Sequence, residues 1–399
     1  MKVLVLNCGS SSIKFKLIDM PANNVLESGG IEKLGLPDSQ LKYNKGNEPK
    51  KYIKKPINTH LDGVNMILSL LTDKETGVLG KLSDIEAVGH RVVHGGEKFS
   101  ASVLITDDVI KQIEDCKKLA PLHNAPNLTG IQAVSELMPG VPQVAVFDTA
   151  FHQTMPEKAF MYAIPYELYK NDGIRRYGFH GTSHRFVSQR AEEIIGKKGV
   201  KMITCHLGNG ASIAAIKDGK VMDTTMGLTP LEGLVMGTRS GDIDAGAVTF
   251  LQEYKGWSPK EVSNLLNKKS GLLGLSEVCS DMRDLIEAAK EGKAHAQLAY
   301  DVFIYRIKKY IGSYVAALNG VDVIVFTGGM GENEVPIRRD VIKDMDALNL
   351  YVDEKKNEEI RSKGGEGDIA PDGAKVKVLV IPTDEEYMIA YDTLNIVKK

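Results

Sequence analysis

A glycine- and serine-rich turn follows the first apolar run of the chain, Val3 to Leu6. Gly9 lets the backbone approach an anion closely, and the hydroxyls of Ser10 to Ser12 add hydrogen-bond donors. Asn7 precedes this turn and Lys14 follows it, so an amide and a cation border the same place. The turn predicts a phosphate site, although an ordinary hairpin explains it better when it is taken alone. No Walker A sequence occurs in the chain, which excludes that route to a nucleotide.

Two further glycine clusters stand later in the chain. Residues 206–210 read His-Leu-Gly-Asn-Gly, and a histidine here either donates to a phosphate or is simply satisfied at a strand end. Residues 327–333 carry glycines at 328, 329 and 331, directly after an apolar run that ends at Phe326. Strand, glycines and helix in succession are typical of a nucleotide site at the carboxyl end of a sheet. The spacing differs from GxGxxG followed by an acidic residue, which disfavours a nicotinamide cofactor.

Arg91 and Arg239 each lie in a segment bordered by glycines, 89–96 and 237–241. A guanidinium donates a fork of hydrogen bonds, which suits a planar carboxylate or a transferring phosphoryl group. Surface arginines rarely need glycines on both sides. We therefore predict a functional role for both arginines.

Acidic residues follow two apolar runs that we expect to be strands. Asp148 comes directly after Val144 to Phe147, a position where α/β enzymes often hold a metal or a base. The run Asp384 to Glu386 follows another strand, and Mg²⁺ needs few carboxylates because it keeps waters and substrate phosphates. An acidic helix N-terminus is a strong alternative for this second run.

His180 and His184 have the i, i+4 spacing of a zinc pair. No third ligand of matching type is visible, so we set zinc aside. A single histidine beside a transferring phosphoryl group is the better hypothesis.

The elements that must position these residues show an internal repeat. Strand, turn and strand at 3–18 recur at 202–216, and both copies end on an acid, Asp19 and Asp218. Aligning Gly9 with Gly208, with one extra residue in the second copy, places Ser12 on Ser212. A pattern repeated half a chain apart predicts duplicated lobes.

The remaining pattern alternates strands with helices, which predicts an α/β protein. We expect Asn124 and Pro126 to precede a helix over 128–137, and Ser280 or Asp281 to cap a helix over 285–290. The other expected elements are strands at 85–90, 144–147 and 321–326, a helix over 298–318 and a surface loop at 362–372.

Composition limits the class of protein. The 399 residues favour two domains, and 43% apolar with 26% charged residues is the balance of a globular protein. The net charge of −2 gives no general attraction to nucleic acid or to an anionic membrane. A lysine cluster at 42–55 is interpreted as a solvated surface hairpin.

Four dispersed cysteines without a CxxC pair fit reduced thiols, and Cys8 and Cys205 are expected in the core. We find no signal-peptide pattern and no run long enough to span a membrane, so we expect a cytoplasmic protein.

The segments Asn7–Phe15 and Tyr177–His184 resemble the two signature stretches of the acetate kinase family. The resemblance runs nearly from Met1 to Asp392 and includes 90–96, Asp148, 206–210, Arg239, 281–283 and the glycines around Gly329. It implies the actin, Hsp70 and sugar-kinase superfold: two duplicated ribonuclease-H-like α/β domains with an active-site cleft between them. The N-terminal lobe would comprise 1–149 with 384–399. The C-terminal lobe, 150–383, would bind nucleotide and form a homodimer.

The resemblance also implies a reaction, the reversible Mg²⁺-dependent transfer of phosphoryl between ATP and acetate, with Mn²⁺ as a possible substitute. Asn7 and Glu385 would hold the metal, and Arg91 the acetate. Asp148 is the family's acid/base residue, whereas we expect it to position substrate or metal because ionised acetate needs no base. The family's transition-state residues correspond to His180 and Arg239, and its methyl pocket to Val93, Leu122, Phe179 and Pro230. The nucleotide site would be lined by Lys14, His206, Leu207, Gly208, Asn209, Gly210, Asp281, Met282, Arg283, Gly329, Met330, Gly331, Glu332 and Asn333.

The sequence leaves some alternatives open. The family often has asparagine where Asp384 stands, so a role for Asp384 in the metal shell is undecided. Propionate or butyrate can replace acetate as substrate, since one methylene changes affinity by only roughly 1–3 kcal/mol. An actin- or Hsp70-like binding protein would need an additional module for which no residues remain. A sugar kinase would need a more polar pocket.

Overall fold

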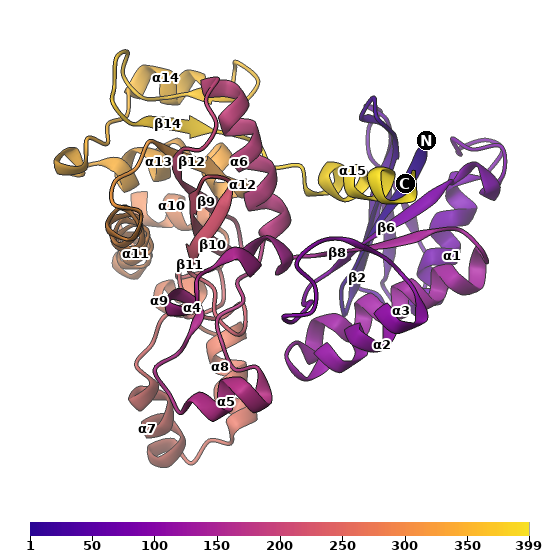
Figure 1. Cartoon of the computed structure of the whole chain (residues 1–399), viewed down its shortest axis with the longest axis horizontal. Helices are drawn as coiled ribbons and strands as arrows, with labels where there is room; N and C mark the ends of the chain where they lie inside the picture. The colour runs from indigo at the N-terminus through magenta and orange to yellow at the C-terminus, as the bar shows by residue number, and fades with distance from the viewer. Residues whose placement is uncertain (399) are drawn as a thin grey trace. The chain divides into compact units, whose positions relative to one another are not determined.

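The computed structural model describes residues 1–398, without the side chains of Pro121 and Leu122. The chain divides into two compact units (Figure 1). Unit 1 comprises Met1–Phe151 together with the segment from Asp384 onward, and unit 2 comprises His152–Thr383. The sequence predicted unit boundaries after residues 149 and 383, and the structure places them after residues 151 and 383.

Unit 1 is built on an eight-stranded sheet with the order β5-β4-β3-β2-β1-β6-β8-β7. Its strands are β1 (Lys2–Cys8), β2 (Ser12–Asp19), β3 (Asn24–Glu32), β4 (Gln40–Lys45), β5 (Lys51–Lys54), β6 (Ala87–Val92), β7 (Val103–Leu104) and β8 (Gln143–Phe147). Its α-helices are α1 (His60–Leu71), α2 (Asp107–Asp115), α3 (Pro121–Leu137) and α15 (Glu385–Val397).

Both faces of this sheet are covered, and β1 shows why. Alternate side chains point to opposite faces of a strand. Leu4 and Leu6 join the core beneath α1 and α3, whereas Val3 and Val5 pack against Ile389 of α15. Figure 1 shows α15, from the C-terminal end of the chain, lying beside the first strands. Gly89 of β6 permits this packing, because a Cβ there would lie 2.6 Å from the Ile389 side chain.

Unit 2 contains a six-stranded sheet with the order β11-β10-β9-β12-β14-β13. Its strands are β9 (Lys201–Leu207), β10 (Ala211–Lys217), β11 (Lys220–Thr224), β12 (Val323–Thr327), β13 (Gly367–Asp368) and β14 (Lys377–Val380). Its α-helices are α4 (Glu157–Phe160), α5 (Tyr166–Asp172), α6 (Gly181–Ile195), α7 (Ala245–Lys255), α8 (Pro259–Lys268), α9 (Gly271–Ser276), α10 (Met282–Lys290), α11 (Ala294–Leu318), α12 (Gly328–Asn333), α13 (Val335–Ile342) and α14 (Glu354–Glu359). Short 3₁₀ turns cover Leu82–Asp84, Cys116–Lys118, Ala150–Thr154 and Asp346–Leu348.

The duplication predicted from the two hairpins is confirmed by topology. In unit 1 the order β3-β2-β1-β6-β8 has antiparallel β3, β2 and β1, followed by parallel β6 and β8. In unit 2 the order β11-β10-β9-β12-β14 repeats the same directions. The expected α/β class with two related domains is therefore correct.

The residue alignment of the two hairpins was wrong beyond the glycines. Cys8 pairs with Ile13 in the first hairpin, whereas Leu207 pairs with Ala211 in the second. The second turn is thus one residue shorter, not longer, and Ser212 occupies the place of Lys14. Serine at both sites misled the alignment, because side-chain type does not fix the register of a hairpin; the turn length does.

The start of α3 was also wrong. The helix begins at Pro121 and contains Pro126, and Asn124 lies inside it rather than capping it. The Asn124 side chain instead accepts from the backbone of His94 at 3.1 Å, so a tertiary contact replaces the expected cap. The cap of α10 is Asp281, one of the two predicted residues, whose carboxylate accepts from the Arg283 amide.

The expected surface loop at 362–372 instead contains β13 and the buried residues Ile369 and Ala370, whereas three other expectations are met. The lysine cluster lies on the antiparallel β4–β5 pair. Cys8 and Cys205 are buried, and burial raises the pKa of both thiols, that of Cys8 to about 12. Among the described residues, no helix combines the length and the apolar character needed to cross a bilayer.

Glu27 of β3 is a carboxyl group inside the core of unit 1. It pairs with Leu17 on one side and Lys45 on the other, and its side chain is 0% exposed. Neither carboxyl oxygen has a hydrogen-bond partner within residues 1–398. Burial raises the pKa of Glu27 to about 7, although the charges of Lys45 and Lys51 oppose the rise. The ionised form is therefore costly in the folded state.

This cost predicts a pH-dependent stability. Between about pH 4.5 and 7 the unfolded chain releases the Glu27 proton while the folded chain keeps it, so wild-type stability falls as pH rises. Relative to Glu27→Gln, the wild type should lose up to about 3 kcal/mol across this range. Urea unfolding at several pH values measures the difference. The exposed control Glu253→Gln should show none, and a pH-independent difference at Glu27 would contradict the assignment.

Candidate active site

Arg91 and Asp148 meet at the carboxyl edge of the unit 1 sheet. Parallel pairing of β6 with β8 sets Val92 opposite Phe147, so the two side chains emerge at neighbouring strand ends. Arg91 Nε donates to Asp148 Oδ1 at 2.9 Å, and Nη2 donates to Oδ2. Asp148 is buried, with 1% of its side chain exposed. The two residues form a bidentate pair.

The pair keeps Arg91 charged. Burial lowers the pKa of Arg91, but the Asp148 charge and hydrogen bonds, with a contribution from Glu385, more than offset this and raise it. Asp148 occupies the Nε side of the guanidinium. Among the described residues, the Nη1 edge makes only a long contact with Asn7 Oδ1, at 3.5 Å, and so has donors to offer an anion.

Asn7 and Glu385 approach Arg91 from β1 and α15. Glu385 Oε2 lies 4.0 Å from Arg91 Nε. Burial raises the pKa of Glu385 to about 7, while the Arg91 charge lowers it. No group of three metal-ligating side chains occurs within the described part of the chain. One carboxylate and one amide oxygen nevertheless fit Mg²⁺, which takes its other ligands from water and phosphate.

Asp384, whose part in a metal shell the sequence left open, makes structural contacts of its own. Its carboxylate caps α15 by accepting from the Tyr387 amide at 3.0 Å. Lys16 forms ion pairs with Asp384 at 3.3 Å and with Glu386 at 3.4 Å. Of the three adjacent acids, Glu385 is thus the one that neither caps α15 nor pairs with Lys16.

Two asparagines that were not predicted as site residues hold the loop after β6. Asn127 Oδ1 accepts from the Val93 amide at 3.0 Å, and Asn124 Oδ1 accepts from the His94 amide at 3.1 Å. Asn127 also donates to the Cys8 carbonyl, which ties this loop to the first turn. Val93 is buried and Lys14 is exposed opposite Asn7. The predicted pocket residue Leu122 has a side chain outside the described part of the structure.

His180 and Arg239 converge on the second hairpin, in unit 2. His180 begins α6 with a left-handed backbone, φ 57°, and its ring stacks on His206 with centroids 4.3 Å apart. A Cβ at Gly210 would lie 3.5 Å from both His180 Nε2 and Arg239 Nη1. The histidine and the arginine therefore approach the same point beside Gly210.

Arg239 lacks a counter-ion. Its guanidinium donates to the Pro230 carbonyl at 3.1 Å, and no carboxylate pairs with it among residues 1–398. Burial lowers the pKa of Arg239. A partly buried cation without a carboxylate partner favours the approach of negative charge.

The glycine cluster after β12 lies beside the same hairpin, since Thr327 pairs with His206. Gly328, with φ 75°, approaches the Leu207 backbone so closely that a Cβ would lie 2.9 Å from it. Glu332 accepts from the amides of Gly328 and Thr383 at 2.8 and 3.0 Å. Its carboxylate thus holds the turn together, while Gly329 has open space around it.

Two other predicted segments join this region. Gly237 donates to the Asn209 carbonyl at 3.0 Å and lies close to the Ser280 carbonyl, which brings 281–283 near the hairpin. Met282 is buried, whereas Arg283 is exposed and pairs with Asp281. Phe179 is buried and its carbonyl lies 2.8 Å from His152 Nε2.

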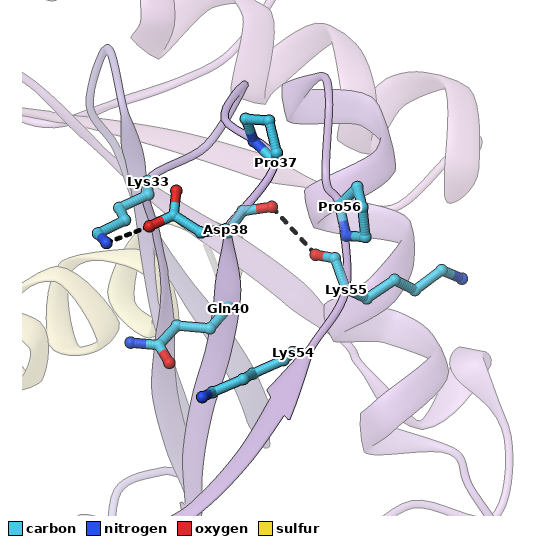
Figure 2. A pocket seen from close by; sticks show the side chains of 8 residues that line it. Lys33, Pro37, Asp38, Gln40, Lys54, Lys55 and Pro56 are labelled. Carbon is cyan, nitrogen blue, oxygen red and sulfur yellow. Dashed lines mark hydrogen bonds and ion pairs between the residues drawn. The ribbon is translucent and has the colours of Figure 1, made fainter.

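A pocket of about 340 Å³ lies elsewhere in unit 1 (Figure 2). It is lined by Lys33, Pro37, Asp38, Ser39, Gln40, Lys54, Lys55 and Pro56. None of these residues was predicted for the site. Asp38 and Lys33 already pair with each other there, as Figure 2 shows.

A duplicated α/β fold with glycine turns and cations at the strand ends defines an enzyme of the phosphotransferase class. The chain belongs to the acetokinase family, whose model matches residues 2–391. It is 59% identical to an acetate kinase of Bacteroides thetaiotaomicron, with the whole of both chains covered.

Solved structures agree. The crystal structure of Porphyromonas gingivalis acetate kinase superposes with a TM-score of 0.95 at 55% identity, covering 99% of each chain. A propionate kinase of Francisella tularensis gives 0.92 at 43% identity, again with 99% of each chain covered.

The buried pair Arg91–Asp148 predicts a large effect of removing one charge. Asp148→Asn should lower the free energy of unfolding by about 2–4 kcal/mol, because Arg91 loses its counter-ion and meets an amide. Chemical denaturation measures the change. Asp372→Asn, which breaks an exposed pair with Lys356, is the matched control and should leave stability unaltered. Equal effects of the two variants would refute the special role of the buried pair.

Proposed function

We propose that this chain catalyses the reversible, Mg²⁺-dependent transfer of a phosphoryl group between ATP and acetate, giving ADP and acetyl phosphate. The observation that carries the proposal is Arg239, a partly buried cation beside His180 and Gly210 that has no counter-ion among the described residues. The transferring group is a compact anion whose charge must be neutralised in place. The Bacteroides thetaiotaomicron and Porphyromonas gingivalis relatives are both named acetate kinase, which supports acetate as the acceptor.

Arg91 and Asp148 of unit 1 serve the carboxylate end of the reaction. The Nη1 edge of Arg91 binds the acetate or acetyl phosphate, and Asp148 holds the guanidinium in place. We assign the methyl pocket to Val93, Leu122, Phe179 and Pro230. Ionised acetate is already nucleophilic, and Asp148 already accepts two hydrogen bonds from Arg91, so Asp148 positions Arg91 and removes no proton.

Residues of unit 2 serve the phosphate end. His180 and Arg239 stabilise the charge of the transferring group in direct in-line displacement. The nucleotide lies against the two glycine turns, where the backbone at Gly208, Gly210 and Gly329 permits close approach. Glu332 acts on the nucleotide site through the turn that its carboxylate holds. The other residues that we propose to surround the nucleotide are Lys14, His206, Leu207, Asn209, Asp281, Met282, Arg283, Met330, Gly331 and Asn333.

Asn7 and Glu385 would hold Mg²⁺, which neutralises phosphate charge when bound. Mn²⁺ prefers similar oxygen ligands and can substitute. Binding of a cation requires the ionised form of Glu385, so metal and proton compete for this carboxylate.

Acetate and propionate differ by one methylene, which an apolar pocket separates by about 1–3 kcal/mol. The likeness to a propionate kinase makes propionate the second candidate substrate. The alternative of an actin- or Hsp70-like binding protein loses its support, because the family match occupies nearly the whole chain.

The test is formation of acyl phosphate from ATP, Mg²⁺ and acetate, propionate, butyrate or glycerol, trapped with hydroxylamine. We expect the highest kcat/KM with acetate, and a fall of kcat by about 10³-fold or more in Arg239→Ala. Arg91→Ala should abolish activity, and the exposed control Arg361→Ala should retain it. If propionate leads, the substrate assignment changes; if no carboxylate reacts, the proposed activity is wrong.

We also infer a cytoplasmic homodimer that associates through unit 2. The support is α7, in which no residue is buried, and whose Phe250 and Tyr254 are 59% and 69% exposed with stacked rings. Exposed neighbouring aromatics of this kind mark protein contacts. A second copy of the chain is the partner that this proposal commits to.

The inference predicts a change of oligomeric state. Phe250→Glu combined with Tyr254→Glu should convert a dimer to a monomer in light scattering, because two charges would be buried at the contact. Tyr52→Glu, at a residue 55% exposed in unit 1, is the control and should stay dimeric. A monomeric wild type, or a double variant that stays dimeric, would contradict the inference.

A further inference from the structure

A chain of hydrogen bonds lies behind His180, on the side of the ring away from Gly210. His180 Nδ1 lies 2.9 Å from Ser212 Oγ. The same oxygen lies 2.8 Å from His184 Nε2, and His184 Nδ1 lies 2.7 Å from Thr204 Oγ1. Four side chains from α6, β9 and β10 are thus linked in series.

The interior members of this series are inaccessible to water. His184, Ser212 and Thr204 are each 0% exposed. Burial lowers the pKa of His184 well below its usual value, and the nearby His152 and His206 lower it further. His184 is therefore a neutral imidazole with one donor and one acceptor nitrogen.

When His180 is neutral, as His184 is, and the Ser212 hydroxyl donates to one of the two rings, the series can run in two directions. In the first, Thr204 donates to His184 Nδ1, His184 Nε2 donates to Ser212, and Ser212 donates to His180 Nδ1. His180 then carries its proton on Nε2, the nitrogen that faces Gly210 and Arg239 Nη1. In the second, every donor reverses and His180 Nε2 becomes an acceptor.

The charge of the ligand selects between these directions. An acceptor nitrogen at Nε2 repels a phosphoryl oxygen, whereas a proton there donates to it. We propose that Thr204, His184 and Ser212 are positioning residues that fix His180 as the Nε2-protonated tautomer and hold its ring toward the transferring phosphoryl group. This inference rests on the proposed function and assigns roles to three residues beyond those named there.

The left-handed backbone at His180 strengthens the need for such support. A non-glycine residue with φ 57° is strained unless its surroundings hold it. The bond to Ser212 and the stacked His206 ring supply that restraint. Ser183 Oγ lies 2.8 Å from His206 Nδ1 and holds that ring in turn. Each of the two stacked rings is therefore fixed by a serine hydroxyl.

A double-mutant cycle tests the proposal by its dependence on His180. Ser212→Ala should lower kcat for acyl phosphate formation by about 10-fold with KM values changed less than about twofold, since it loosens a group that acts in the transition state. In a His180→Ala background the same change should alter kcat less than about twofold. The control Ser188→Ala removes a buried hydroxyl that donates to the Arg185 carbonyl within α6. This variant should leave kcat unchanged.

Thr204→Val keeps the side-chain shape and provides a second variant in case Ser212→Ala does not fold. We expect a fall of kcat of about threefold that is also lost without His180. A normal kcat in these variants, or an equal fall in both backgrounds, would overturn the inference.

Nitrogen NMR of histidine-labelled protein with inorganic phosphate provides a readout that needs no turnover. The His180 signal, assigned by its loss in His180→Ala, should show the Nε2-protonated tautomer, and the Nδ1-protonated tautomer would overturn the proposal. If the wild type makes no acyl phosphate yet shows the predicted tautomer, the proposed function fails and the positioning series stands.

Discussion

Parallel pairing of strand ends is the constraint on which the site depends. In unit 1, β1, β6 and β8 run in the same direction, so Asn7, Arg91 and Asp148 emerge at one edge. In unit 2 the equivalent pairing sets His206 beside Thr327 and the glycines that follow. Parallel strands end at the same side of a sheet. Residues that follow these strands therefore become neighbours although they are distant in sequence.

The two arginines at these edges are held in opposite electrostatic states. Asp148 balances the charge of Arg91, so a carboxylate that binds at the Nη1 edge, as we propose, would leave this ion pair intact. Arg239 has no carboxylate partner in the described part of the chain. Negative charge that develops beside it, as in the proposed reaction, would be stabilised by this partly buried cation.

Local patterns in the sequence predict the fold class, the duplication and most strands, because apolar runs ending in glycine or acid leave few alternatives. They also identify Arg91 and Arg239, which glycines border, and Asp148, which follows a strand, as candidates for the site. The role of Asn124 could not be predicted, since its amide is used by a loop 30 residues away rather than by its own helix. The hairpin register failed for the same reason: turn length is a property of three-dimensional closure and not of residue type.

The return of the chain to unit 1 at α15 has a consequence for biosynthesis. Val3, Val5 and Val146 remain uncovered on one face of their sheet until the last helix, with Ile389 and Leu394, leaves the ribosome. Unit 2 is synthesised entirely before that moment. The unit whose translation begins first is therefore the last to complete its core, and the nascent chain must keep an apolar sheet face from aggregating during its translation.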